Sequence, residues 1–305
     1  MTVLPQLHGV LVLDKPSGPT STRCLAQIKR LGQKKIGHAG TLDPLASGVL
    51  LVLLGQATKL SPYLLEGGGK VYSGTLRLGQ TSDTWDSEGE ILAEAPWDAV
   101  SPEAVTAGIE AWRGVKEQAV PPYSAAKLSG QPLYRLARKG RAVTGKVKRV
   151  EISQATVLEV SLPLVRFRVA CGSGTYIRSL AHSLGKRLGC GAVLAQLTRE
   201  YSHPFGIGHA CGLQAILDDP GLLVRSLRPL REALPGWPCI ALSRAEAADI
   251  RNGRPVPADP AADLAGLAES GNRAVLLEND CELALARLEP AACGYEWAVL
   301  RGLWN

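Results

Sequence analysis

The chain has 305 residues, of which 46% are hydrophobic and 20% charged, a composition typical of globular proteins and not of disordered chains. The longest unbroken apolar run, residues 49–54, is much shorter than the roughly 20 residues of a membrane-spanning helix. A signal peptide has basic residues before its apolar run, and no Lys or Arg precedes the first apolar run here. Seven scattered cysteines without a CxxC pair indicate reduced thiols in a cytoplasmic protein, not a zinc ribbon.

Strands and helices alternate over the first three quarters of the chain. Apolar runs predict strands over residues 8–14, 48–54, 70–78, 147–160 and 163–171. Apolar residues that recur with a 3.6-residue period, each set followed by a glycine, predict helices over residues 21–31, 101–113 and 175–188. Residues 37–48, between the first helix and the second strand, are predicted to form an irregular loop punctuated by glycines.

A change of composition near residue 235 predicts two domains, over residues 1–234 and 235–305. Residues 235–238 (PGWP) are typical of a joint, and Ser243 and Glu246 then have the spacing of a capping box for a short helix. Three strand-like runs follow, over residues 273–277, 282–288 and 295–300. The second domain is therefore predicted to be small and rich in β-strands.

The net charge is +6, and its distribution is uneven. Residues 121–150 carry eight basic side chains and no acidic one, whereas residues 240–305 carry six basic and ten acidic side chains. A block that basic repels itself unless a polyanion binds it, although a solvated surface is the alternative interpretation.

Common catalytic motifs are absent from the sequence. It contains no GxxxxGK[ST], GxSxG or HExxH, and no GxGxxG after a strand, and its five histidines do not pair at metal-ligand spacing. We therefore expect neither a bound metal ion nor a nucleotide cofactor.

Asp43 is the first candidate catalytic residue. Pro44 restricts Asp43 to an extended conformation, so a loop between two apolar elements would present its carboxylate. Spacing alone leaves open that Asp43 merely caps a turn and that His38 is an ordinary polar loop residue.

A second group of candidates surrounds the helix at 175–188. Gly172-Ser173-Gly174 leads into its N-terminus, where free N–H groups favour anions, and Tyr176 and Arg178 are expected in its first turn. A guanidinium there would fix the direction of a nearby carboxylate, unless Arg178 is simply a surface residue. Lys70 and Tyr72 share one face of a predicted strand, where packing is the alternative role for the tyrosine.

Five segments together resemble one family. GVLVLDKPSGPTS, KKIGHAGTLDPLASGVLLVLLGQATK, KVYSGTLRLGQTSDTWDSEGE, PPYSAAKLSGQPLYRLARKG and SGTYIRSLAHSLGKRLGCGAVLAQLTR are similar, in order and over residues 8–232, to the bacterial TruB family of tRNA pseudouridine-55 synthases. The resemblance implies an α+β catalytic core, with a large, mixed, mainly antiparallel sheet flanked by helices, and a small β-rich PUA-like C-terminal domain.

The implied reaction isomerises one uridine of the tRNA T-loop after the base has been flipped out. The N1–C1′ bond breaks, the base turns, and a C5–C1′ bond forms. By resemblance the catalytic residues are Asp43, Tyr72 and Arg178. Asp43 acts as nucleophile or ribose-side base, Tyr72 stacks on the base and takes the C5 proton, and Arg178 pairs with Asp43. Whether Asp43 attacks C1′, attacks C6 or abstracts a sugar proton stays open.

The resemblance also implies RNA-binding residues. His38 fills space vacated in the RNA loop, Tyr176 and Leu197 line the pocket, and Lys15 belongs to a motif that supports the catalytic loop. Residues 124–150 form a basic insertion that clamps RNA and orders only on binding, with the candidate contacts Lys127, Arg138, Lys139, Arg141, Lys146 and Lys148. The acidic C-terminal domain contacts tRNA through a local basic face such as Arg251 and Arg254, or acts mostly as a spacer.

The expected partner is the T-arm of tRNA. We expect a cytoplasmic monomer with no cofactor, no membrane association and no obligatory protein partner. Two alternatives remain: a pseudouridine synthase with another RNA target, including a guide-dependent enzyme of the archaeal and eukaryotic kind, and an RNA-folding chaperone that needs only the basic surface.

Overall fold

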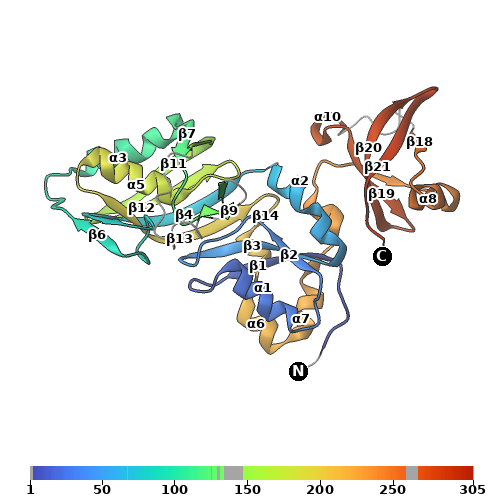
Figure 1. Cartoon of the computed structure of the whole chain (residues 1–305), viewed down its shortest axis with the longest axis horizontal. Coiled ribbons are helices and arrows are strands. Elements are labelled where there is room, and N and C mark those ends of the chain that lie inside the picture. The colour runs from blue at the N-terminus through green and yellow to red at the C-terminus, as the bar shows by residue number, and fades with distance from the viewer. Residues whose placement is uncertain are drawn as a thin grey trace.

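The structure is a computed structural model that describes residues 3–66, 68–124, 126–128, 131–133, 147–258 and 267–304. Figure 1 shows a long twisted main sheet with its helices, and a smaller sheet formed by the C-terminal residues in orange and red. The main sheet is built from residues 9–228 and the smaller one from residues 239–302. The α+β fold class predicted from the sequence is confirmed.

The main sheet has ten strands, in the order β11-β12-β4-β13-β3-β1-β15, with β2, β14 and β16 paired beside this path. Their bounds are β1 (Gly9–Lys15), β2 (Ile36–Ala39), β3 (Ala46–Leu54), β4 (Lys70–Leu78), β11 (Ile152–Ser161), β12 (Leu164–Cys171), β13 (Ala192–Ser202), β14 (Phe205–Gly206), β15 (Cys211–Gly212) and β16 (Leu227–Arg228). Most neighbours are antiparallel, and only the β13–β3 and β1–β15 pairs are parallel. The sheet is therefore mixed and mainly antiparallel.

Strand β13 joins the two halves of the main sheet. On one side it pairs with β4, where Leu197 lies opposite Gly74, and on the other it runs parallel to the start of β3, where Leu197 lies opposite Ala46. The loop that precedes β3 therefore emerges beside the middle of β13 and β4.

The central strands are buried on both faces, which explains their continuous apolar sequences. Leu11 and Leu13 of β1 pack into a core cluster with the apolar sides of the main-sheet helices, whereas the alternate residues Val10 and Val12 pack into a second cluster on the opposite face.

Three helices follow the signals in the sequence. Helix α1 (Ser21–Lys29) begins after Thr20, whose hydroxyl accepts a hydrogen bond from the Arg23 N–H. Helix α3 (Pro102–Glu110) has Ser101 as its N-cap, and α5 (Ile177–Leu188) ends at Gly189 in the left-handed conformation. No helix in the described residues is both long enough and apolar enough to cross a membrane.

Short elements complete the N-terminal part. They are α2 (Ser61–Glu66), α6 (Leu213–Asp218), α7 (Pro220–Arg225), the 3₁₀ turns η1 (Gly55–Leu60), η2 (Ala111–Gly114), η3 (Ile207–His209) and η4 (Leu230–Ala233), and the strand pairs β5 (Gln80–Ser82) with β6 (Ile91–Glu94), β7 (Glu117–Ala119) with β10 (Val147–Arg149), and β8 (Lys127–Leu128) with β9 (Gln131–Pro132).

The C-terminal part is a five-stranded sheet in the order β17-β19-β20-β21-β18. Its elements are β17 (Cys239–Ala241), α8 (Arg244–Arg251), β18 (Val256–Ala258), α10 (Leu267–Ser270), β19 (Arg273–Glu278), β20 (Cys281–Ala291) and β21 (Gly294–Gly302). The predicted capping box is present, since Ser243 and Glu246 exchange hydrogen bonds at the start of α8.

The C-terminal sheet packs on the second face of the main sheet. Leu285 and Leu303 belong to the same buried cluster as Val10 and Val12 of β1. At the edge of this contact, the Arg273 guanidinium lies 5.4 Å from the ring centre of Tyr63 and forms an ion pair with Glu66. The contact combines an apolar centre with a cationic residue at its rim.

Three local expectations are wrong. Residues 37–48 are not irregular throughout, because Ile36–Ala39 form β2 on the edge of β3 and only residues 40–45 form a loop. The strand predicted over 147–160 is two strands, because β10 pairs with β7 while β11 pairs with β12. Tyr176 is the N-cap of α5 and lies before its first turn.

Gly48 is required where β3 passes β13. Its φ of +94° is unfavourable for any residue with a Cβ atom, and such an atom would overlap the carbonyl group of Arg199. We expect Gly48→Ala to lower the free energy of unfolding by about 2 kcal/mol or more, measured by urea denaturation. Gly208→Ala is the control, since a Cβ atom there meets nothing within 4 Å. Equal stability of both variants would contradict this account of the strand contact.

Candidate active site

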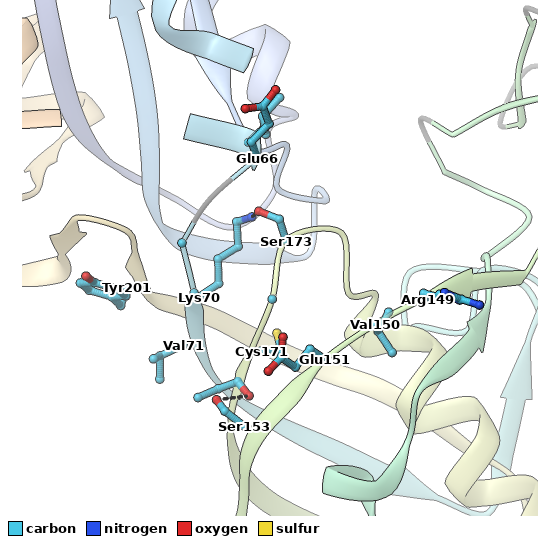
Figure 2. Close-up of a pocket in the computed structure, with 15 residues that line it drawn as sticks. Glu66, Lys70, Val71, Arg149, Val150, Glu151, Ser153, Cys171, Ser173 and Tyr201 are labelled. Carbon is cyan, nitrogen blue, oxygen red and sulfur yellow. Dashed lines mark hydrogen bonds between the residues drawn. The ribbon is translucent and has the colours of Figure 1, made fainter. Parts of the chain in front are cut away.

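Two adjoining cavities open where the loop at residues 40–45 meets β4, β13 and the segment before α5. The first has a volume of about 640 Å³ and is lined by Asp43, Tyr72 and residues from all these elements. The second, of about 750 Å³, extends along β4 and β12 and is shown in Figure 2. Lys70 and Ser173 line both cavities. Both volumes are in the range of about 300–1,000 Å³ that is typical of ligand sites.

Asp43 is held by Arg178 at the first cavity. The Arg178 Nε donates a hydrogen bond of 2.9 Å to Asp43 Oδ2, and the arginine side chain is only 4% exposed while the aspartate is 37% exposed. Nη1 and Nη2 of Arg178 donate to the carbonyl oxygens of Thr84 and Tyr123. The guanidinium therefore fixes the carboxylate through one nitrogen, and its remaining donors anchor it to the protein.

Asp86 is a second carboxylate beside the same guanidinium, and the sequence analysis did not identify it. Its Oδ2 lies 3.6 Å from Arg178 Nε, and its Oδ1 accepts hydrogen bonds from the Thr84 hydroxyl and the Glu88 N–H. The two carboxylates thus share a guanidinium. No group of three or more His, Cys, Asp and Glu residues within the described ranges could hold a metal ion.

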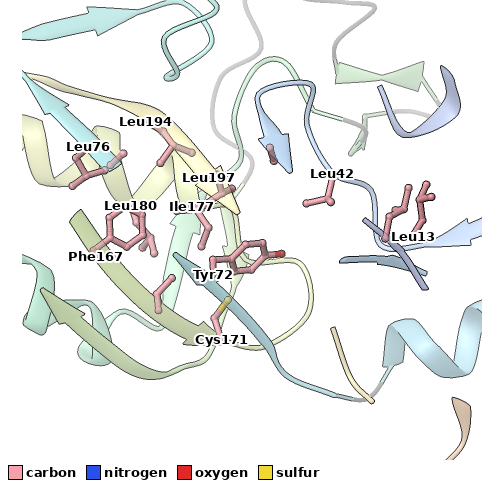
Figure 3. Close-up of a cluster of buried hydrophobic side chains, with 14 of the residues drawn as sticks. Leu13, Leu42, Tyr72, Leu76, Phe167, Cys171, Ile177, Leu180, Leu194 and Leu197 are labelled. Atoms are coloured by element: carbon pink, nitrogen blue, oxygen red, sulfur yellow. The ribbon is translucent and has the colours of Figure 1, made fainter. Parts of the chain in front are cut away.

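Tyr72 projects from β4 beside the first cavity and is 6% exposed. Figure 3 shows its ring beside Leu197 and Ile177 at the end of the core cluster, with the hydroxyl directed away from Phe167. Burial raises the pKa of the Tyr72 phenol, and the nearby Arg199 guanidinium partly opposes that rise. Tyr72 is therefore a neutral aromatic surface at neutral pH, with its hydroxyl beside a cation.

Arg199 is a site residue that the sequence reasoning missed. It is 1% exposed on β13, and its Nε and Nη2 donate to the carbonyl oxygens of Val49 and Gly40. These two carbonyls lie on either side of the Asp43 loop, so one side chain holds both ends of that loop. The only sequence signal was the position of Arg199 two residues after Leu197, on the same side of a strand.

Lys15 lies beneath the loop at residues 40–45, as expected of the motif to which it belongs. Its side chain is completely buried, and its ammonium group donates to the carbonyls of Pro16 and Pro19 and, at 3.4 Å, to that of Pro44. Ser21 adds a second anchor, because its hydroxyl accepts from the Leu42 N–H. The loop at residues 40–45 is thus held from β1 and α1 as well.

The other predicted pocket residues divide into two groups. Leu197 and Tyr176 line the first cavity, and Tyr176 is fixed by hydrogen bonds between its main chain and the Gln118 side chain. His38 lies on β2 outside the lining of either cavity, and its buried Nδ1 has no hydrogen-bond partner among the described residues. Burial and the charge of Arg199 lower the pKa of the His38 imidazole.

Only part of the predicted basic clamp is described. Lys148 lies on β10 and lines the first cavity, and Lys127 lies in the short strand β8. Arg138, Lys139, Arg141 and Lys146 lie outside the described residues.

Lys70 is a buried cation between the two cavities, 7% exposed, and it donates a hydrogen bond of 2.7 Å to the Ser173 hydroxyl. Burial, with the charges of Arg199 and Lys148, lowers the pKa of the Lys70 ammonium to about 8. The sequence analysis placed Lys70 beside Tyr72 and gave it no role.

Comparisons with known proteins identify the class. The family model of the TruB pseudouridylate synthases, N-terminal domain, matches residues 29–177. A protein of Oleidesulfovibrio alaskensis named tRNA pseudouridine synthase B is 59% identical, over 99% of this chain and 98% of its own length. One of the same name from Nitratidesulfovibrio vulgaris is 58% identical, over 98% of this chain and 99% of its own length.

Solved structures agree on the fold. A chain of a Cbf5–Nop10–Gar1 complex is 26% identical with a TM-score of 0.68, over 98% of this chain and 85% of that one. A chain of an H/ACA ribonucleoprotein bound to a substrate RNA is 23% identical, also with a TM-score of 0.68, over 98% of this chain and 86% of that one.

The family model, the relatives and the fold are those of a pseudouridine synthase, an isomerase that changes the bond between a uracil base and its ribose. Within that class, the chain belongs to the TruB family.

Substitution of Arg178 by lysine is expected to impair isomerisation severely. Lysine keeps the positive charge but leaves the carbonyls of Thr84 and Tyr123 without their guanidinium donors and loses the fixed direction of Nε. We expect Arg178→Lys to lower the rate of isomerisation about a hundredfold or more in a single-turnover assay. Arg187→Lys, on the same helix, is the control. A near-normal rate for Arg178→Lys would show that Asp43 is oriented by other groups.

The pKa of Lys70 predicts how stability depends on pH. The folded protein releases this proton near pH 8, whereas the unfolded chain retains it to about 10.5, so raising the pH between these values stabilises the folded state. The Lys70→Met variant does not gain this stability as the pH rises, because methionine has no group to titrate. Its free energy of unfolding should therefore exceed the wild-type value by more at pH 7 than at pH 9, as measured by urea denaturation.

The control for this measurement is Lys116→Met, which alters an exposed lysine. Its stability difference from wild type should be the same at both pH values. If the stability difference between Lys70→Met and wild type were also the same at pH 7 and pH 9, Lys70 would have an ordinary pKa in the folded protein.

Proposed function

We propose that this chain isomerises uridine 55, in the T-loop of tRNA, to pseudouridine. The observation that carries the proposal is the Asp43–Arg178 pair at the edge of a cavity that also presents Tyr72. The relatives that share nearly the whole chain are named tRNA pseudouridine synthase B, which favours tRNA as the substrate. The cavity cannot reach a base inside folded RNA, so the uridine must be flipped out to enter it.

Asp43 is proposed to act on the ribose side of the base. Breaking the N1–C1′ bond develops positive charge at C1′, which a fixed, partly exposed carboxylate stabilises or captures. The free base then turns and C5 bonds to C1′. The proton that leaves C5 is balanced by one that N1 gains, so the reaction consumes no cofactor.

Tyr72 is proposed to stack on the flipped uracil and then to accept the C5 proton. The neutral phenol suits stacking directly. Proton removal needs the phenolate, which burial disfavours and the Arg199 cation favours, so we propose that Arg199 assists Tyr72 in the last step. Tyr176 and Leu197 would contact the same base from the other walls of the cavity. We propose that His38 enters the RNA loop in place of the flipped base.

The basic insertion, residues 124–150, is proposed to clamp the RNA backbone. Its candidate contacts are Lys127, Arg138, Lys139, Arg141, Lys146 and Lys148, and Lys148 lies at the first cavity. Cations that bind phosphates release counterions, so tRNA affinity should fall steeply with salt.

The C-terminal domain, which we propose to begin at residue 235, is proposed to act mainly as a structural spacer. Its net charge is negative, and the two arginines that could form a basic face are already paired: Arg251 with Glu278, and Arg254 with Asp249. We also propose a cytoplasmic monomer that needs no protein partner and no cofactor. The Nop10 and Gar1 proteins belong to the Cbf5 complex and are not invoked for this chain.

The alternatives have less support. An RNA-folding chaperone needs only a basic surface, so it gives no reason for a buried arginine to fix Asp43 beside Tyr72. A guide-dependent enzyme or another RNA target shares the same chemistry, but the most similar relatives described above are named for tRNA.

Release of a label from C5 tests the proposal. With tRNA transcript carrying tritium at C5 of uridine, wild-type protein should release tritium from position 55 only. Asp43→Asn should bind tRNA with an affinity changed only a few-fold but release tritium at less than about a hundredth of the wild-type rate.

Asp98→Asn, at an exposed aspartate outside both cavities, is the matched control and should react normally. Release from another position would replace uridine 55 as the target. A normal rate for Asp43→Asn would remove Asp43 from the mechanism.

A further inference from the structure

The second cavity has no role in the reaction described so far. It lies on the far side of Lys70 and Ser173 from Asp43, and these two residues stand at the boundary of the two cavities. Leu65 also lines both cavities, so the two cavities share three lining residues. The second cavity therefore adjoins the site proposed for the flipped base.

Lys70 lacks an anionic partner at this boundary. Its ammonium has three N–H groups, and within the described residues it donates one hydrogen bond, to the neutral Ser173 hydroxyl, and forms no ion pair. The nearest acidic candidates lining the second cavity are Glu66 and Glu151. Glu66 is paired with Arg273, and Figure 2 shows its carboxylate directed away from Lys70, while Glu151 lies beside Cys171.

Other cations surround the same point. Arg199 and Lys148 line the first cavity with Lys70, and neither forms an ion pair within the described part of the chain. Lys148 lies against Gly174, where a Cβ atom would overlap its ammonium group, so the Gly172–Gly174 segment allows this cation to come close. Three cations thus converge while the single aspartate in the lining, Asp43, is bound by Arg178.

A buried cation without a counter-ion is unfavourable unless a ligand supplies one. We propose that Lys70 and Ser173 bind a phosphodiester group of the RNA next to the flipped uridine, and that the adjoining nucleotide enters the second cavity. The inference rests on the proposed function, because it takes the base in the first cavity to be part of an RNA strand. A chain that leaves the first cavity along β4 must pass this boundary.

The test is a double-mutant cycle between the protein and the RNA backbone. T-arm stem–loop RNAs carry one uncharged methylphosphonate at the linkage on the 5′ side of the target uridine, on its 3′ side, or one step further 3′. The affinity of each is measured for wild-type protein and for Lys70→Met. At the linkage that Lys70 contacts, either change alone should weaken binding about tenfold, and both together should weaken it no further.

Two controls separate this effect from a general loss of affinity. Lys59→Met removes a half-buried lysine, which donates to the Gly302 carbonyl and lies outside both cavities. The loss of affinity that it causes should be the same at all three linkages. Ser173→Ala keeps the ammonium but removes its hydroxyl partner, so it should reduce the same linkage effect in part. It also serves if Lys70→Met does not fold.

Additive effects at all three linkages would overturn the phosphate site. The tritium-release assay on wild-type protein remains a separate readout, so a failed cycle with normal release rejects the inference and leaves the proposed function standing. If binding shows coupling at one linkage but the wild-type protein releases no tritium, the phosphate site is supported and the proposed function is rejected.

Discussion

The site depends on the burial of one guanidinium between two carboxylates and two backbone carbonyls. Arg178 touches Asp43, Asp86 and the carbonyls of Thr84 and Tyr123, which come from three separate segments of the chain. Its charge is compensated only while all these segments are in place, so the Asp43 carboxylate takes its orientation only when these distant loops have folded together. Removing one partner would leave buried charge or carbonyl groups unsatisfied.

The Asp43 loop is held by two more buried cations, which bind main-chain carbonyls and no carboxylates. Arg199 reaches Gly40 and Val49, and Lys15 reaches Pro44. Carbonyl groups at the ends of irregular segments are costly to bury, and long cationic side chains satisfy several at once. Arg199 also lines the first cavity, so the support of the loop adds positive charge to that cavity.

The sequence predicts the site unevenly. Asp43, Tyr72 and Arg178 stand in dense local motifs. In the structure Asp43 and Tyr72 line one cavity, and Arg178 binds Asp43. Arg199 and Asp86 were missed because their importance comes from β13 and from a turn over 82–90, whose positions are set by tertiary pairing. The fold class and most of the long strands follow from apolar runs, but β13 and the short strands such as β2 do not, since polar residues interrupt them and neighbouring strands decide their conformation.

The packing of the C-terminal sheet has a consequence for the order in which the protein matures. Leu285 and Leu303 cover a face of β1 and β3 that is made hundreds of residues earlier in synthesis. Until the ribosome has released them, the nascent main sheet carries an exposed apolar surface on β1 and β3. The finished polypeptide is therefore the first species in which the loop rests on a closed core, and shortened products would be prone to aggregate before they could act.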